Sequence, residues 1–365
     1  MSLTLENVSL NVAGEAYIYA TTLHLQAASM NVLLGPTRSG KTTLMRLMAG
    51  LEKPTSGRIL WRGEDVTSLP VQRRDIAMVY QQFINYPSMT VYENIASPLR
   101  LQKKSNQEID KLVRESAAMM KLSDFLQRKP LELSGGQQQR CALARALVKG
   151  AGLVLLDEPL ANLDYKLREE MRLEIPRLFT ESGAIFVYAT TEAEEALLLG
   201  GNTATLAAGN IVQFGATESV YREPDNRLSA ETFSNPPMNF IDIQCSDGQF
   251  SVAKKALSSL NTLFTGQPDG NYRLGFRPCD VLLAGDSPQS LQFDADLRLT
   301  EITGSQSYLH LQYGAEHWVG LVAGIGHFEV GARISIFVNP SDCYLFDAQG
   351  SRLRTADPQE MTANG

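Results

Sequence analysis

Glycine, hydroxyl and lysine residues suited to hold phosphate gather early in the chain. The stretch Gly35–Thr42 reads Gly-Pro-Thr-Arg-Ser-Gly-Lys-Thr and fits the pattern G-x-x-x-x-G-K-[ST]. An apolar run, Met30–Leu34, precedes it and a helical pattern follows it. Glycines allow backbone N–H groups to turn toward anionic oxygens, and a helix N-terminus adds positive potential. In this context the pattern predicts a nucleoside triphosphate site.

Within this loop, Lys41 is expected to reach the β- and γ-phosphates and the Thr42 hydroxyl to bind Mg²⁺. The alternative is a glycine-rich strand-to-helix turn without a ligand, which the flanking strand and helix disfavour. The residues predicted to contact the nucleotide here are Gly35, Pro36, Thr37, Arg38, Ser39, Gly40, Lys41, Thr42 and Thr43.

Two adjacent acids end a second apolar run, in the sequence Leu153-Val154-Leu155-Leu156-Asp157-Glu158-Pro159. Asp157 is predicted to help hold Mg²⁺. Glu158 faces the other way, because adjacent residues at a strand end point to opposite sides. It is the candidate base that polarises the attacking water. The alternative is a helix-capping acidic pair, which the phosphate loop upstream makes less favourable.

A third stretch, Ser134-Gly135-Gly136-Gln137, opens a helical pattern. A serine and two glycines at a helix start present a hydroxyl and bare N–H groups, which again suit phosphate. We therefore predict that all four residues contact a nucleotide.

These motifs require strands to end beside one another. Alternating apolar runs and helical patterns predict an α/β domain with parallel strands, and the period-two pattern of residues 3–12 predicts an antiparallel sheet beside it. The adjacent Pro236 and Pro237 indicate a domain boundary. Short alternating stretches beyond them predict a small all-β barrel or a pair of barrels. The expected domains are 1–235, with a helical subdomain at about 85–150, and 236–365.

Composition narrows the function classes. The chain has 365 residues, with 44% hydrophobic and 20% charged residues and a formal charge of −7. The acidic balance disfavours nucleic-acid binding, which needs a basic face. Without a bilayer-length apolar run or a signal peptide, we expect a soluble chain whose membrane role comes through a partner. The four scattered cysteines form no CxxC pair, which favours reduced thiols over disulfides and disfavours metal binding by cysteine.

Together, Leu133–Gln137 and the Leu-Leu-Asp-Glu-Pro stretch after a phosphate loop resemble the ATP-binding subunits of ABC transporters, over residues 1 to about 235. The resemblance implies ATP as substrate and Mg²⁺ as cofactor. It also implies that Gln81 contacts Mg²⁺ and the attacking water, and that Asp164 of Asn162-Leu163-Asp164 crosses a dimer interface. The segment after Gln81, Phe83–Ile95, resembles the part that receives the coupling helix of a membrane permease subunit.

The last third resembles the regulatory domain, an all-β OB-like barrel, of importer ATPases for sugars and polyols, through Gly275-Phe276-Arg277-Pro278 and Pro237-Met238-Asn239-Phe240. Glycerol-type importers look most similar. The resemblance implies a peripheral subunit on the cytoplasmic side of the inner membrane. Such a subunit would power import of glycerol, another polyol, a sugar or a sugar phosphate through separate permeases, and serve a periplasmic or extracellular solute-binding protein indirectly.

The chain departs from this family at two positions. The family's histidine that bonds the γ-phosphate is replaced by Thr191, which Glu192 follows. The four histidines of the chain are His24, His310, His317 and His327, and their places in the sequence make them unsuited to substitute. A threonine hydroxyl reaches less far than imidazole and carries no charge, so we expect weakened hydrolysis at this site.

The second departure concerns the aromatic residue that stacks on adenine. Val12 aligns with it, and Tyr17 or Tyr19 could replace it. The alternative for both tyrosines is packing within a strand.

Two such subunits sandwich two ATPs in this family, each phosphate loop facing the partner's Ser-Gly-Gly-Gln turn. Two copies of this chain would give two poor sites, so we expect a second, non-identical ATPase subunit. A soluble ATP-dependent regulator without a transporter is the alternative. A nucleic-acid-associated ABC ATPase is disfavoured by the acidic charge and the single ATPase domain.

Overall fold

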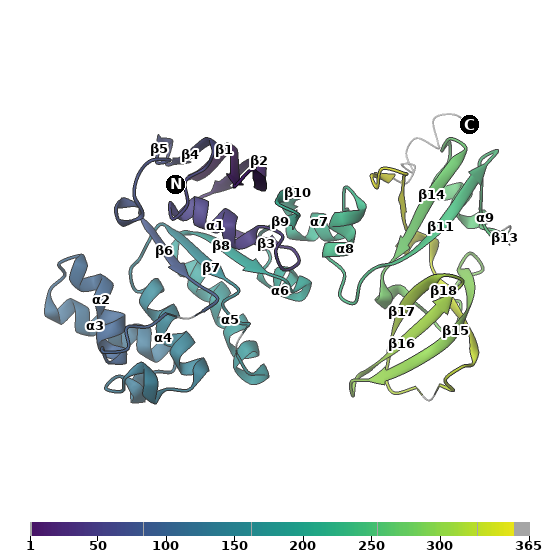
Figure 1. Ribbon diagram of the computed structural model, residues 1–365. Helices are drawn as coiled ribbons and strands as arrows, with labels where there is room; N and C mark the ends of the chain where they lie inside the picture. Colours follow the sequence, from purple (N-terminus) through teal and green to yellow (C-terminus); the bar gives the residue numbers. More distant parts are fainter. Residues whose placement is uncertain (1, 83, 162, 254, 327, 354–365) are drawn as a thin grey trace. The chain divides into compact units, whose positions relative to one another are not determined.

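A six-stranded sheet lies at the centre of the first part of the chain in the computed structural model (Figure 1). Its strands, in spatial order, are β10 (Asn210–Ala216), β9 (Asn202–Ala207), β3 (Met30–Leu34), β8 (Ile185–Thr190), β7 (Leu153–Asp157) and β6 (Ile76–Val79). Neighbours from β9 to β6 are parallel, and β10 is antiparallel to β9. Every residue of β3, β7 and β8 is buried, as expected for a sheet covered on both faces.

The structure describes residues 2–82, 84–161, 163–253, 255–326 and 328–353. The chain divides into two units, Met1–Val220 and Tyr221–Gly365, and each is described by itself.

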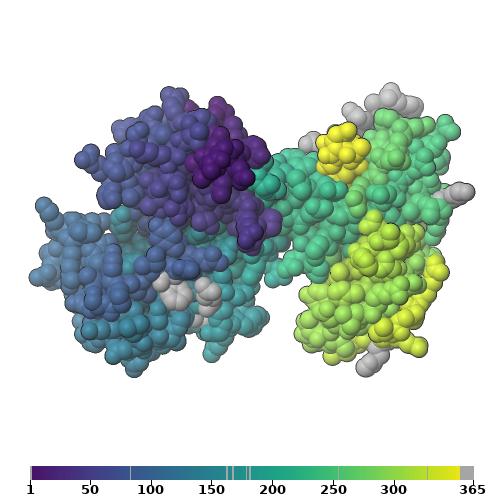
Figure 2. Space-filling model, viewed as in Figure 1, coloured from purple at the N-terminus to yellow at the C-terminus, as the bar shows by residue number. Residues whose placement is uncertain are grey.

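An antiparallel sheet covers one side of the first unit. It contains β2 (Glu15–Gln26), β1 (Ser2–Val12), β4 (Ser56–Trp61) and β5 (Glu64–Asp65). Helix α1 (Lys41–Ala49) contributes apolar side chains to a core shared by both sheets. The N-terminal strands, purple in Figure 2, lie at the surface of this unit. The alternating pattern of β1 arises because one face of the strand is buried and the other is more exposed.

Helices cover the opposite face of the central sheet. They are α2 (Val91–Leu101), α3 (Asn106–Met119), α4 (Gly135–Leu147), α5 (Tyr165–Ser182) and α6 (Ala193–Leu199). Residues of β7 alternate between the two cores. Leu153 and Leu155 pack on the α1 side, and Val154 and Leu156 pack with residues of α2, α3 and α4. Short 3₁₀ turns are at Val71–Arg73, Ser123–Phe125, Pro130–Glu132, Pro278–Asp280 and Pro340–Asp342.

A buried amide holds the segment that enters α2. Asn94 is fully buried, and its Nδ2 donates to the carbonyls of Tyr86, Met89 and Thr90 at 3.1, 3.1 and 2.9 Å. Its Oδ1 accepts the Tyr86 N–H at 2.8 Å. One side chain thus bonds to four backbone groups and fixes the segment that enters α2.

Two sheets build the second unit, together with α8 (Arg227–Thr232), α9 (Ser258–Leu263) and the end of α7 (Thr217–Arg222). One sheet contains β13 (Lys255–Ala256), β12 (Gln249–Val252), β11 (Asn239–Ser246), β14 (Gly270–Phe276), β19 (Tyr344–Phe346) and β20 (Arg352–Leu353). The other contains β17 (Glu316–Ala323), β16 (Gln306–Tyr313), β15 (Leu291–Ile302) and β18 (Arg333–Val338).

Both sheets share one aromatic core around Trp318. Its ring stacks on Tyr313 with centroids 4.6 Å apart and meets Phe276 and Phe293 edge-on. Its Nε1 donates to the Phe240 carbonyl at 2.8 Å, so the buried indole is satisfied. The predicted α/β domain with parallel strands, followed by a second, β-rich domain, is therefore confirmed.

The division between the units falls earlier in the chain than the predicted domain boundary at 235/236. The physical reason lies in α8 and the residue before it. Ala230 packs in one cluster with Met238, Phe240 and Phe346, and Asn226 bridges to Ser351. Residues 221–235 therefore pack on the β-rich unit. The domain limits 1–235 and 236–365 stay a prediction.

Replacing Asn94 tests the buried amide. Asn94→Ala should lower the free energy of unfolding of the first unit by about 2–4 kcal/mol, because it removes the four hydrogen bonds of a fully buried amide. Urea unfolding followed by far-ultraviolet circular dichroism reports it, since the longer helices lie in this unit. Gln107→Ala, at an exposed position of α3, is the control and should change little; equal effects of the two substitutions would contradict the assignment.

Candidate active site

The predicted phosphate loop joins β3 to α1. Gly40 has φ 104° and precedes the first turn of α1, a backbone conformation that favours glycine. A side chain at Gly35 would collide with the Leu206 carbonyl and the Ser39 side chain. The Ser39 Oγ is buried without a hydrogen-bond partner among the described residues, which leaves it available to a ligand in the loop.

Lys41 extends from α1 back into this loop. Its ammonium donates to the carbonyls of Gly35 at 2.8 Å and Pro36 at 3.1 Å and lies 3.5 Å from the Glu158 Oε1. Burial lowers the pKa of Lys41, and the carboxylates of Glu158 and Asp157 oppose that shift. The loop thus concentrates one cation where an anionic phosphate would bring further compensating charge.

Thr42 and Asp157 bring two oxygens together. The Thr42 hydroxyl donates to the Asp157 Oδ1 at 3.1 Å, from α1 to the end of β7. Burial raises the pKa of Asp157, and the Thr42 hydrogen bond opposes the shift. No cluster of three His, Cys, Asp or Glu side chains in the described ranges could hold a metal alone. One carboxylate and one hydroxyl beside a phosphate site fit Mg²⁺, which uses few protein ligands and keeps waters and substrate oxygens.

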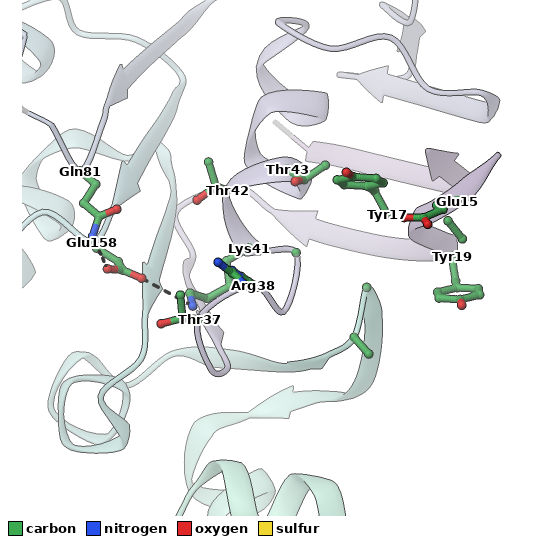
Figure 3. A pocket seen from close by; sticks show the side chains of 14 residues that line it. Glu15, Tyr17, Tyr19, Thr37, Arg38, Lys41, Thr42, Thr43, Gln81 and Glu158 are labelled. Carbon is green, nitrogen blue, oxygen red and sulfur yellow. Dashed lines mark hydrogen bonds and ion pairs between the residues drawn. The ribbon is translucent and has the colours of Figure 1, made fainter. Parts of the chain in front are cut away.

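Glu158 occupies a sharp turn after β7. Its backbone has φ 45°, in the left-handed region that is costly for a residue with a side chain. The Glu158 N–H donates to the Ala189 carbonyl at 3.0 Å, and the Gln81 Nε2 donates to the Glu158 Oε2 at 2.9 Å. Figure 3 shows the carboxylate between Gln81 and Lys41. The structure therefore brings together the predicted base, the predicted water-contacting amide and the phosphate-binding lysine.

These groups line a cavity of about 730 Å³, a size that suits a nucleotide. Its lining residues are Glu15, Ala16, Tyr17, Tyr19, Thr37, Arg38, Gly40, Lys41, Thr42, Thr43, Gln81, Glu158, Ala208 and Gly209. Several of these, including Glu15 and Gly209, carry no sequence signal for a site. Gly209 reaches it through the β9–β10 turn, where its N–H donates to the Ser39 carbonyl at 3.0 Å.

Tyr17 and Tyr19 lie on the same face of β2 at the end of the cavity away from Gln81 (Figure 3). Both side chains are about half exposed, at 50% and 49%. Val12, the position aligned with the family's aromatic residue, does not line the cavity. Tyr17 and Tyr19, unlike Val12, thus present exposed aromatic surface to the cavity.

The Ser-Gly-Gly-Gln stretch begins α4, as predicted. Ser134 caps the helix in a reciprocal pair, in which the Gln137 N–H donates to Ser134 Oγ at 3.4 Å and the Ser134 N–H donates to Gln137 Oε1 at 2.9 Å. Neither this stretch nor Asp164 lines the cavity. Asn162 and Phe83 lie outside the described residues.

Thr191 lies in the turn between β8 and α6 and is exposed. Its neighbour Thr190 is buried, and the Thr190 carbonyl accepts the Gly35 N–H of the phosphate loop at 3.3 Å. His24 is the only histidine in the sequence of the first unit; it bonds to Thr4 at 2.8 Å on the exposed face of β2 and does not line the cavity. No imidazole stands in for the missing one among these cavity residues.

The chain is similar to known ATP-binding proteins of transporters. A family model described as "ABC transporter" matches residues 19–161. The sn-glycerol-3-phosphate import ATP-binding protein UgpC of Rhizobium meliloti is 36% identical over 96% of this chain and 99% of that protein. The trehalose/maltose import ATP-binding protein MalK of Thermococcus litoralis is 37% identical over 89% and 92%. The multiple sugar-binding transport ATP-binding protein MsmK of Streptococcus mutans is 36% identical over 87% and 89%.

A solved structure of an ATP-binding cassette is also similar to this chain. The ADP- and phosphate-bound dimer of the ATP-binding cassette MJ0796 superposes with a TM-score of 0.54 and is 29% identical, covering 59% of this chain and 98% of that one. Among the residues that the structure describes, no helix is long and apolar enough to cross a membrane. With the nucleotide site assembled as described and relatives matched along most of its length, the chain belongs to the ATP-binding subunits of ABC transporters.

Proposed function

We propose that this subunit binds and hydrolyses ATP to power import of a small polar solute through separate permease subunits. The solute class is glycerol, another polyol, a sugar or a sugar phosphate, which the relatives named for sugar and sn-glycerol-3-phosphate import support. The observation that carries the proposal is the convergence of Lys41, Glu158 and Gln81 on one cavity.

Each side chain has a distinct part in hydrolysis. Lys41 and the loop from Gly35 to Thr43 bind the phosphates. Thr42, Asp157 and Gln81 would hold Mg²⁺, which would neutralise phosphate charge. Glu158 orients the attacking water and takes up its proton, while the Gln81 amide fixes the carboxylate and the water. The Ser134–Gln137 turn and Asp164 complete the site of a partner subunit.

The hydrolytic site of this chain is weakened. Thr191 aligns with the family's histidine that bonds the γ-phosphate, and loss of one positioned contact in a transition state costs roughly 10²–10³ in rate. A transporter with two such sites would turn over slowly. We therefore propose a second, non-identical ATPase subunit, whose phosphate loop pairs with the intact Ser134–Gln137 turn to form the faster site. A second ATPase reading frame beside two permease frames would support this pairing.

The subunit is proposed to act at the cytoplasmic face of the inner membrane. Ile84 and Tyr86 support a permease contact, because their side chains are 57% and 47% exposed on the segment before α2. A solute-binding protein would take part indirectly, and no nucleic acid is involved. A soluble regulator without a transporter is the second candidate, and it would have no use for this exposed surface.

Restoring the imidazole tests the weakened site. The purified chain should hydrolyse ATP slowly, and Thr191→His should raise kcat at least about tenfold, because it restores a contact made in the transition state. Steady-state phosphate release measures it. Glu158→Gln in the Thr191→His chain is the control and should abolish the gain. Rapid turnover of the unmodified chain that Thr191→His leaves unchanged would refute the proposal.

Removing the aromatic pair tests adenine stacking. The double substitution Tyr17→Ala, Tyr19→Ala should raise the Kd for ATP roughly tenfold, since stacking of a base on an aromatic ring contributes about 1–3 kcal/mol. Titration calorimetry with the Glu158→Gln chain avoids turnover. Val12→Ala is the matched control and should bind normally; if it weakens binding as much as the double substitution, the tyrosines are not the stacking residues.

Charging the exposed segment tests the permease contact. Ile84→Asp should greatly reduce co-purification with the permease subunits while leaving ATP binding unchanged, because it buries a charge in the interface. Leu101→Asp, at an 85% exposed position at the end of α2, is the control. Normal co-purification of the Ile84→Asp chain would favour the regulator.

A further inference from the structure

A buried carboxylate lies directly behind the turn that carries Thr191. Glu195, on α6, is 5% exposed. Its Oε2 accepts hydrogen bonds from the Thr190 hydroxyl at 2.6 Å and the Tyr188 hydroxyl at 3.0 Å. Arg172 Nη2 lies 3.7 Å from its Oε1, and Glu192 is the other charged group nearby. The end of β8 is thus bonded to α6 through two hydroxyls.

The same network fixes the residue on the far side of Thr191. The Thr190 Oγ1, which donates to Glu195, also accepts the backbone N–H of Glu192 at 3.0 Å. The Glu192 carboxylate is paired with Arg168 at 3.2 Å and Arg172 at 2.7 Å, both from α5. Both chain neighbours of Thr191 are therefore held, although the Thr191 side chain is exposed.

The strand end that Glu195 holds also supports the nucleotide site. The Ala189 carbonyl accepts the Glu158 N–H at 3.0 Å, and the Thr190 carbonyl accepts the Gly35 N–H at 3.3 Å. Glu158 depends on such support, because its backbone lies in the left-handed region. A shift of β8 by a fraction of an ångström would move the base and the start of the phosphate loop together.

We infer that Thr190 and Glu195 are positioning residues of the ATPase site, which hold the residue-191 turn in a hydrolysis-competent geometry even though the imidazole is missing. The weakness of the site then lies in one side chain and not in a relaxed loop. The activity part of this inference rests on the proposed function, while its structural part does not.

The Thr190 hydroxyl can be removed without changing the size of the side chain. Thr190→Val keeps the shape and deletes the hydroxyl that bridges Glu195 and the Glu192 amide. Thr190→Ser keeps the hydroxyl and is the conservative rescue. Thr203→Val deletes a fully buried hydroxyl on β9 of the same sheet and controls for a general loss of stability.

The first measurement is ATPase activity of the full chain, with each of these substitutions combined with Thr191→His. We expect Thr190→Val to lower the kcat of the Thr191→His chain about tenfold, which removes most of the gain, while KM for ATP changes far less. Thr190→Ser and Thr203→Val should keep the gain. The second measurement is hydrogen exchange of the Glu158 and Glu192 amides, which should be faster in the Thr190→Val chain only.

The two measurements separate the possible failures. Faster exchange in Thr190→Val with retention of the gain would overturn the positioning role, and so would unchanged exchange. If Thr191→His gives no gain in any background, the weakened-site proposal fails. Hydrogen exchange alone then tests whether Thr190 and Glu195 hold the residue-191 turn. Exchange that is faster only in Thr190→Val supports this role, and exchange that is equally fast in Thr203→Val overturns it.

Discussion

The rest of the nucleotide site depends on the burial of the Lys41 ammonium. A cation removed from water must be compensated by nearby acceptors. Here two carbonyls of its own loop and the Glu158 carboxylate do so. Those partners come from the ends of β3 and β7, so the parallel order of the strands is what makes the arrangement possible. Parallel strands bring their carboxyl ends to one edge, where side chains distant in sequence meet.

Features of the site could be predicted from the sequence where their residues lie close together in the chain. The phosphate loop and the Ser134 turn are each one continuous stretch of sequence. Their glycines, hydroxyls and flanking periodicity suffice to predict a strand–loop–helix for the first and a helix start for the second. The pairing of Gln81 with Glu158 is of another kind, because it joins residues from two strand ends. The family resemblance implied only that Gln81 contacts Mg²⁺ and the attacking water.

The sequence could not decide the role of other residues of the site. Tyr17 and Tyr19 alternate in β2 as packing residues would, and only the fold shows that they face a cavity. Gly209 reads as an ordinary hairpin turn, and its contact with Ser39 depends on how β9 lies beside β3. The position of the unit boundary was also beyond the local pattern, since the proline pair marks a break in regular structure and not the surface on which α8 packs.

The distribution of aromatic residues between the two units has a practical consequence. The chain has two tryptophans. Trp61 is partly exposed beside the Arg62 guanidinium, while Trp318 is 1% exposed inside the aromatic core of the β-rich unit. Emission from an indole shifts to longer wavelength with hydration, so the emission maxima of Trp61 and Trp318 differ in the native state. The protein therefore carries one intrinsic optical reporter in each unit, and the melting of either can be followed in the same cuvette without a label.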